Sequence, residues 1–320
     1  MSGNRLNVLL TVDTELSPGL GAKTPSVLRT NLNSSIYGTP SGEYGLPFQL
    51  ETLQRHGLQA VFFVEALSPI VTGMQPLQEI VDLVEKANQE VQLHIHTEWL
   101  AMSEHNPLGQ STGQNMHAFS EQEQSAIIEI AKRNLEQCST SPVTAFRAGN
   151  YGADNNTLKA LARNNISFDS SYNYTYLDGQ CRMEAPQMLT QPACINGVWE
   201  VPITHFRDRP GSYRHAQLCA CSYGELSSML LQAYRAGADT FVIVSHSFEL
   251  INRARTRANR LVVKRFLRLC QFLSQRQDLF RTVGFNDLSL YEVEQSPPLT
   301  SSIWRTSTRY AQQLLGRIYE

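Results

Sequence analysis

Residues 6–13 read LNVLLTVD, a nearly continuous run of leucine and valine that ends on an acid. Such a run predicts a strand buried on both faces, as in a parallel sheet that is covered by helices. Further along the chain, short apolar runs alternate with segments whose apolar residues recur at helical spacing. Strands that alternate with helices predict a parallel sheet with both faces covered.

The alternation continues through most of the chain. Seven or eight strand–helix units within about 290 residues predict an α/β fold, a single deformed (β/α)7–8 barrel rather than two domains. We expect the barrel to span residues 1–295 and residues 296–320 to form a C-terminal amphipathic helical tail. The polar stretch 17–45 is expected to be a long loop. The expected strands are 6–13, 59–66, 91–96, 144–147, 166–169, 198–204, 240–245 and 280–284, and the expected helices are 47–56, 76–89, 120–137, 155–164, 225–236 and 253–276.

Composition narrows the functional class. The chain has 320 residues, of which 42% are hydrophobic and 18% charged, a globular composition that excludes a disordered or fibrous protein. A net charge of −2 argues against a polycation that binds nucleic acid. No apolar run is long enough for a transmembrane helix, although the tail could contact a membrane surface. The six cysteines form no CxxC pair, which favours reduced thiols and a cytoplasmic location.

Chemically reactive residues stand where the predicted strands end, and in a barrel of this type that edge carries the active site. His94 and His96 lie two positions apart, so both imidazoles point to one face of their strand, roughly 6–7 Å apart at the backbone. Two such imidazoles and a carboxylate from another strand predict a three-ligand metal site. The other strand ends carry Asp13 and Glu15, Arg147, Asp169, and His246.

In their order along residues 5 to 290, these motifs resemble the polysaccharide deacetylase superfamily (NodB-homology, carbohydrate esterase 4-like). The segment His94-Ile95-His96-Thr97-Glu98-Trp99 resembles its divergent WalW-like subgroup. The resemblance implies a deformed barrel of the NodB-homology type that forms a single domain.

The first two motifs imply a catalytic base and metal ligands. Asp13 matches the family's base, and Glu15 takes the place of the metal-binding acid because Thr14 stands where the family usually has it. His94 matches the first histidine ligand. The family's second histidine position is Glu98 here, so either His96 or Glu98 completes the site; we prefer His96.

The later motifs imply the remaining roles. Arg147 orients the base, and a backbone amide of Asn150 or Tyr151 stabilises the oxyanion. The proline that follows the arginine in the family is replaced by Ala148-Gly149. Asp169 and Tyr172 echo the fourth motif. His246 matches the acid that protonates the leaving amine, and Asp169 is expected to hold its other ring nitrogen.

Aromatic side chains near these motifs are candidates for stacking on a sugar ring. We name Trp99, Tyr151 and Tyr172, with Tyr174 and Tyr176 in the same cluster. The remaining histidines are expected to be solvated, apart from a weaker claim to the site for His205; they are His56, His105, His117 and His215.

The function that the resemblance implies is metal-dependent hydrolysis of an N-acetyl group, an amide C–N bond, on a sugar of a surface polysaccharide or its precursor. The cofactor is a divalent metal, with Zn²⁺ first and Co, Ni and Fe as alternatives. One alternative function is a barrel amidase that acts on a small non-sugar amide. Another is a non-catalytic glycan-binding relic. The sequence names neither the sugar nor the oligomeric state.

Overall fold

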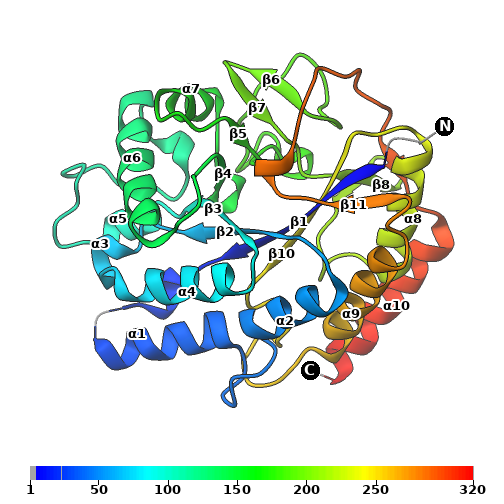
Figure 1. The fold of residues 1–320 in the computed structure, drawn as a ribbon, viewed down its shortest axis with the longest axis horizontal. Helices are drawn as coiled ribbons and strands as arrows, with labels where there is room; N and C mark the ends of the chain where they lie inside the picture. The colour runs from blue at the N-terminus through cyan, green and yellow to red at the C-terminus, as the bar shows by residue number, and fades with distance from the viewer. Residues whose placement is uncertain (1–4, 23, 320) are drawn as a thin grey trace.

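The structure is a computed structural model that describes residues 5–22 and 24–319, and the side chains through residue 313. One curled sheet runs through its centre (Figure 1). Along it the strands follow the order β10-β1-β2-β3-β4-β5-β7-β6, and β11 also pairs with β1. Every pairing is parallel except that of β6 with β7. The predicted α/β fold with a deformed, single-domain barrel is therefore confirmed.

The strands are short and mostly buried. They are β1 Leu6–Thr14, β2 Val61–Glu65, β3 Glu90–Ile95, β4 Ala145–Ala148, β5 Phe168–Asp169, β6 Ala193–Ile195, β7 Val198–Glu200, β10 Thr240–His246 and β11 Phe280–Thr282. Strand β7 ends before Pro202, which cannot donate a ladder hydrogen bond and so explains why the predicted strand 198–204 is shorter than expected.

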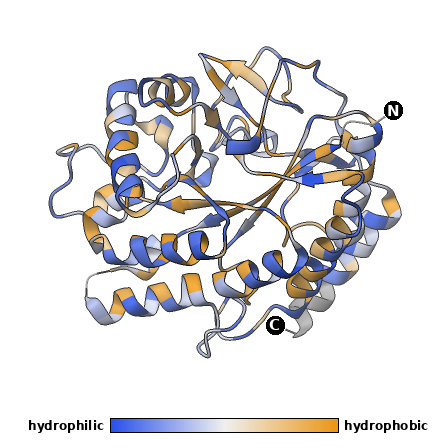
Figure 2. Cartoon of the chain, viewed as in Figure 1, coloured by the Kyte–Doolittle hydropathy of each residue, from blue (hydrophilic) through white to orange (hydrophobic). Residues whose placement is uncertain are grey.

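Helices cover the sheet on its outside (Figure 1). They include α2 Leu46–His56, α4 Gln75–Lys86, α6 Glu121–Cys138, α7 Asn155–Arg163, α8 Tyr223–Arg235 and α9 Arg260–Ser274. Figure 2 shows mixed colours around these helices and orange along the central strands, as expected when only one helix face meets the core. Three of them, α6, α7 and α8, begin with a capping box.

Two predictions about the helices were wrong. The stretch 17–45 contains the helix α1 Pro25–Leu32, followed by a π-helical turn at Asn33–Tyr37. Helix α9 begins at Arg260 instead of 253, because the side chain of Asn259 caps it by accepting from the amide of Val262. Residues 252–257 before it form a turn in which Asn252 Oδ1 accepts from the amide of Thr256 at 2.9 Å.

The strand ladder does not join β10 to β6, so the barrel is completed by an irregular segment, residues 216–218. The amide of Val244 donates to Ala216 O, and the amide of Leu218 donates to Val244 O, both at 2.9 Å. Gln217 forms an isolated bridge with Val244. The segment therefore fills the gap beside β10.

A second, three-stranded sheet was not predicted. Its order is β12-β8-β9, with β8 His205–Arg209, β9 Ser212–His215 and β12 Leu299–Thr300. Strands β8 and β9 form a hairpin, and β12 belongs to the C-terminal segment.

Helix α10, Ile303–Tyr319, ends the described chain and packs against β8 and α8. Ile303 and Trp304 on its first turn are 79% and 84% exposed, whereas Arg309 is fully buried. Among the described helices, none has the length and apolar character needed to cross a membrane.

Candidate metal and catalytic site

Three side chains from the ends of two strands, which are separated in the sheet by β2, converge where a metal site was predicted. Glu15 follows β1, and His94 and His96 lie on and just after β3. Glu15 Oε2 lies 3.3 Å from His94 Nε2 and 2.5 Å from His96 Nε2. The three ligand atoms all lie within 4.8 Å of one another. Two imidazole nitrogens and one carboxylate oxygen are a donor set that suits Zn²⁺ and leaves a position open for water.

The outer nitrogen of each imidazole has its own acceptor. His94 Nδ1 lies 2.8 Å from the carbonyl oxygen of Arg147, and His96 Nδ1 lies 3.2 Å from Glu98 Oε2. Because a carbonyl or carboxylate oxygen accepts, each Nδ1 carries a proton, and Nε2 is the ring nitrogen that faces the cluster. Glu98 therefore lies behind His96 rather than among the converging atoms, and its other oxygen accepts from Asn150 at 3.1 Å.

Charges within the Glu15–His94–His96 cluster shift the pKa values of its members. Burial lowers the pKa of His96, but the carboxylates of Glu15 and Glu98 outweigh burial and raise that pKa well above its usual range. Burial likewise opposes ionisation of Glu15, but the two imidazoles hold its pKa well below normal. A proton on His96 thus occupies the position that a cation would take.

Gly149 lies against the ring of His96. A Cβ at this glycine would stand 2.7–2.8 Å from ring atoms of His96. That distance is too short for any side chain, so only glycine lets the His96 ring approach the backbone after β4. The position of His96 in the cluster therefore depends on a glycine at residue 149.

Asp13 lies beside the cluster, next to a fully buried guanidinium. Arg147 Nη1 donates to Asp13 Oδ1 at 2.7 Å and to Thr11 Oγ1 at 2.8 Å, and its Nε donates to Ser170 O at 3.0 Å. The guanidinium also stacks over the ring of Phe63 at 4.3 Å. Burial alone would raise the pKa of Asp13, but the charges of Arg147, His94 and His246 together outweigh burial, and the pKa lies below its usual value. Asp13 is thus held ionised and in one orientation.

His246 faces Asp13 from the neighbouring strand, because Asp13 and His246 are partners in the β1–β10 register. Its Nε2 lies 4.0 Å from Asp13 Oδ2, and its Nδ1 lies 3.6 Å from Glu249 Oε1. Burial lowers the pKa of His246, but Glu249 and Asp13 together raise it to about 9. His246 is therefore a cation at neutral pH.

Glu249 also connects His246 to the β8–β9 region. Gln217 Nε2 donates to Glu249 Oε1 at 2.6 Å, and Gln217 Oε1 lies 2.9 Å from His215 Nε2. The second oxygen of Glu249 accepts from Ser245 Oγ at 2.9 Å.

These groups surround a cavity of about 280 Å³, close to the lower end of the roughly 300–1,000 Å³ common for small-ligand sites. One wall is aromatic. The rings of Tyr151 and Tyr176 stack at 5.4 Å, and His215 lies 5.5 Å from Tyr176. Asn150 and Tyr151 both have φ of +56°, a left-handed conformation that is strained for these residues and common at functional sites. The cavity is lined by Asp13, Glu15, His94, His96, Ala148, Asn150, Tyr151, Tyr176, Gln180, His215, Gln217 and His246.

Three predicted site residues lie elsewhere. Asp169 does not hold His246: its Oδ1 accepts from Ser171 Oγ at 2.7 Å, because its strand turns the carboxylate away from the cavity. Trp99 is fully buried in the core. Tyr172 is 2% exposed, accepts through its hydroxyl from the amide of Leu189, and faces a separate surface cavity.

The sequence interpretation missed the residues that complete the cavity. Glu249 takes the place expected for Asp169, and it stands three residues after His246. His215 was expected to be solvated, yet it is 9% exposed and lines the cavity. One signal was available, because Pro210-Gly211 marks a turn, and Gly211 has the φ of +71° that such a turn requires.

No protein-family model and no curated protein matches this sequence. Solved structures do match. A candidate polysaccharide deacetylase from Mycobacterium smegmatis is 14% identical, with 97% of this chain and 92% of that chain covered and a TM-score of 0.53. A CE4 family pseudoenzyme from Bacillus anthracis is 13% identical (88% and 65% covered, TM-score 0.45). A family 4 carbohydrate esterase from Streptomyces lividans, in complex with acetate, is 11% identical (87% and 92% covered, TM-score 0.43). The likeness to the mycobacterial structure shows that the two chains share a fold.

Proposed function

We propose that this protein is a metal-dependent deacetylase that hydrolyses an N-acetyl group on a sugar of a surface polysaccharide or its precursor. The observation that carries the proposal is the position of Asp13. It lies beside the Glu15–His94–His96 cluster and opposite a cationic His246, and all of these line one cavity. An acid–base pair next to a three-ligand cluster is the arrangement that hydrolysis of an unreactive amide needs.

Glu15, His94 and His96 would hold the metal, and Zn²⁺ suits their two nitrogens and one oxygen best. The ion supplies Lewis acidity, which polarises the acetyl carbonyl and lowers the pKa of water. Glu98 orients His96, and Gly149 makes room for it. We also propose that the chain belongs to the divergent WalW-like subgroup, and the segment His94-Ile95-His96-Thr97-Glu98-Trp99 supports this proposal.

Asp13 accepts the proton of the attacking water. The Arg147 guanidinium at 2.7 Å keeps it ionised at neutral pH and fixes the carboxylate. The turn at Asn150 and Tyr151 borders the cavity and supplies the backbone amide for the oxyanion.

His246 donates a proton to the leaving amine. Glu249 makes this possible, because its carboxylate keeps the imidazole protonated and orients it through Nδ1. After the amine leaves, Asp13 has gained one proton from water and His246 has lost one to the amine, so one proton has passed in net from His246 to Asp13, and no covalent intermediate is needed.

The rest of the cavity suits a carbohydrate. The stacked pair Tyr151 and Tyr176 offers a ring face, and the amides of Gln180 and Gln217 can hydrogen-bond hydroxyl groups. Among the lining residues given above there is no lysine or arginine, so a neutral sugar fits better than a phosphorylated one.

The test is acetate release from N-acetylated glucosamine oligomers by zinc-loaded and chelator-treated protein. Asp13→Asn is expected to lower kcat at least about 100-fold while bound zinc is retained. The control Asp278→Asn, at an exposed carboxylate, is expected to change neither. Release of an acid other than acetate from a small amide would indicate an amidase. A protein that binds glycan but holds no metal and releases no acid would indicate a relic.

A further inference from the structure

One short segment brings His215 and Gln217 to the cavity. It begins at β8, turns into β9, passes along β10 and ends at Ser222, the N-cap of α8. His215 is held from both sides: its Nδ1 lies 3.0 Å from Thr175 Oγ1, and its Nε2 lies 2.9 Å from Gln217 Oε1. The segment thus forms part of the cavity wall, and it also supports Glu249 through Gln217.

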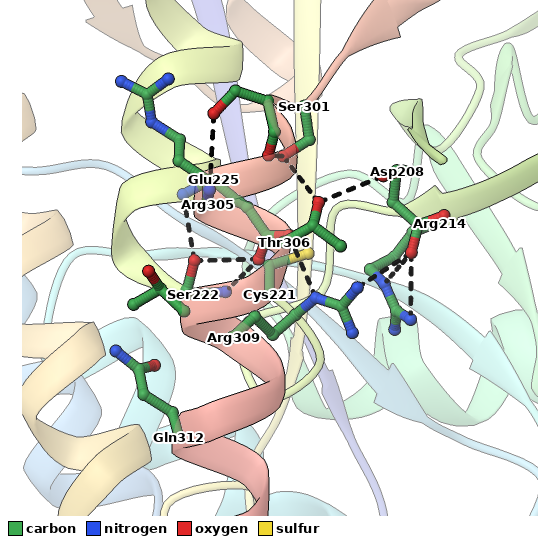
Figure 3. A network of polar contacts seen from close by, with 12 residues as sticks. Asp208, Arg214, Cys221, Ser222, Glu225, Ser301, Arg305, Thr306, Arg309 and Gln312 are labelled. Carbon is green, nitrogen blue, oxygen red and sulfur yellow. Dashed lines mark hydrogen bonds and ion pairs between the residues drawn. The ribbon is translucent and has the colours of Figure 1, made fainter. Parts of the chain in front are cut away.

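A single guanidinium from the C-terminal helix pins both ends of this segment (Figure 3). Arg309 Nη2 donates to Asp208 Oδ2 on β8 at 2.9 Å, upstream of His215. Arg309 Nε donates to Glu225 Oε1 at 3.0 Å, downstream of His215. The other oxygen of Glu225 accepts from the amide and hydroxyl of Ser222 at 2.8 and 2.9 Å.

These three charges are deeply buried. Arg309 and Glu225 have no exposed surface, and Asp208 is 3% exposed. A buried carboxylate that loses its cation is strongly destabilised. Without Arg309, Glu225 loses its 3.0 Å ion pair, and Asp208 keeps only the longer contact with Arg214 Nε at 3.4 Å. The ends of the segment must then move or take up water. The pinning is therefore specific to the guanidinium fork, which reaches two carboxylates at once.

The C-terminal segment also forms backbone hydrogen bonds with β8. β12 pairs with β8 at Leu299↔Phe206, and the amide of Ser301 donates to Arg207 O at 2.8 Å. Thr306 Oγ1 donates to Asp208 O at 3.1 Å, which fixes the same residue that Arg309 pairs with (Figure 3). The helix is thus joined to the hairpin rather than lying loosely on the surface.

We propose that Arg309 is a positioning residue: through Asp208 and Glu225 it holds the segment that carries His215, and His215 in turn forms a substrate-contacting wall of the cavity. The C-terminal helix is then part of the working site and not an appended tail. This inference rests on the proposed function where it concerns substrate, but the effect of Arg309 on His215 can be measured without turnover.

The experiment compares Arg309→Met with Arg305→Met in the full-length, zinc-loaded protein. Arg305 lies on the same helix with an exposed side chain, so it is a matched control. For Arg309→Met we expect zinc affinity within about twofold of the parent, KM for an N-acetylated glucosamine oligomer raised at least tenfold, and a smaller change in kcat. Arg305→Met is expected to leave all three unchanged. A folded Arg309→Met protein with parental KM overturns the proposal.

A second variant and a second readout cover the other outcomes. If Arg309→Met does not fold, Arg309→Lys keeps the charge but loses the fork, and a KM raised at least threefold supports the proposal while an unchanged KM overturns it. The ring NMR signal of His215, assigned with His215→Gln, is expected to shift or broaden in the Arg309 variant while that of His94 does not. If the parent releases no acetate, the proposed function fails, and this signal alone decides whether Arg309 positions His215.

Discussion

Replacing Gly149 by alanine tests whether His96 is a metal ligand. The new Cβ would meet the ring at 2.7–2.8 Å, whereas carbon atoms in contact prefer about 3.5–4.0 Å, so the imidazole or the backbone must retreat by roughly 1 Å. Metal–ligand distances tolerate only about 0.2 Å, so this retreat removes one of the three ligands. We expect zinc affinity to fall about 100-fold, the upper end of the 10–100-fold range for changes that disturb ligand orientation.

The assay is competition for zinc with a chromophoric chelator, together with thermal melting of the metal-free protein to show that the variant folds. Gly224→Ala is the matched control, since a Cβ there meets no atom within 4 Å. In helix α8 that substitution is expected to stabilise the protein by roughly 0.5–1 kcal/mol and to leave zinc affinity unchanged. A folded Gly149→Ala protein with zinc affinity within threefold of the parent would refute the assignment of His96.

Three further predictions concern protons. Glu249→Gln removes the charge that keeps His246 protonated, so the alkaline pH at which activity is lost should be lower than in the parent. A pH profile of kcat measures this value, and an unchanged alkaline pH of activity loss would contradict the role of Glu249. The raised pKa of His96 means that zinc must displace a proton from this side chain at pH 7. Zinc binding should therefore release protons to an indicator dye and weaken as the pH falls. Zinc binding without proton release would argue against His96 as a ligand. His205 is buried, which lowers its pKa to about 4. Near pH 6.5 the unfolded histidine takes up a proton and the folded one does not, so the free energy of unfolding should fall by at most about 3 kcal/mol as the pH drops from 6.5 to 4. Urea titrations of His205→Phe should lack this dependence on pH.

The barrel was predictable because each buried strand is recognisable from a short, continuous stretch of the sequence. Runs such as residues 6–13 are rich in valine and leucine, and their alternation with helices predicts a parallel sheet. Parallel strands end at one edge of the sheet, so the sequence alone predicts that Asp13, His94 and Arg147 lie close together.

The orientation of side chains just beyond a strand was harder to predict. Glu98 and Trp99 are neighbours in the short helix α5 Glu98–Met102, where consecutive side chains point about 100° apart, so Glu98 supports His96 while Trp99 enters the core. The predicted contact of Asp169 with His246 was wrong for a related reason. Strand β5 is only two residues long, and its register with β7 directs the Asp169 carboxylate toward Ser171 and Glu200.

The cavity wall depended on contacts that no local pattern specifies. His215 reaches the cavity because β8 and β9 form a hairpin held by residues almost 100 positions later in the chain. Long-range pairing of this kind is determined by packing and charge complementarity, which a single sequence does not display.

Asp13 and His246 are separated by more than 200 residues along the chain but occupy the same rung of two hydrogen-bonded strands. The separation of their backbones is therefore set by the spacing of adjacent strands, about 4.8 Å, which is the same in any parallel sheet. Insertions or deletions in the intervening loops can reshape what enters the cavity without disturbing that spacing. This architecture can thus admit different ligands to the cavity while the backbones of Asp13 and His246 stay at the same separation.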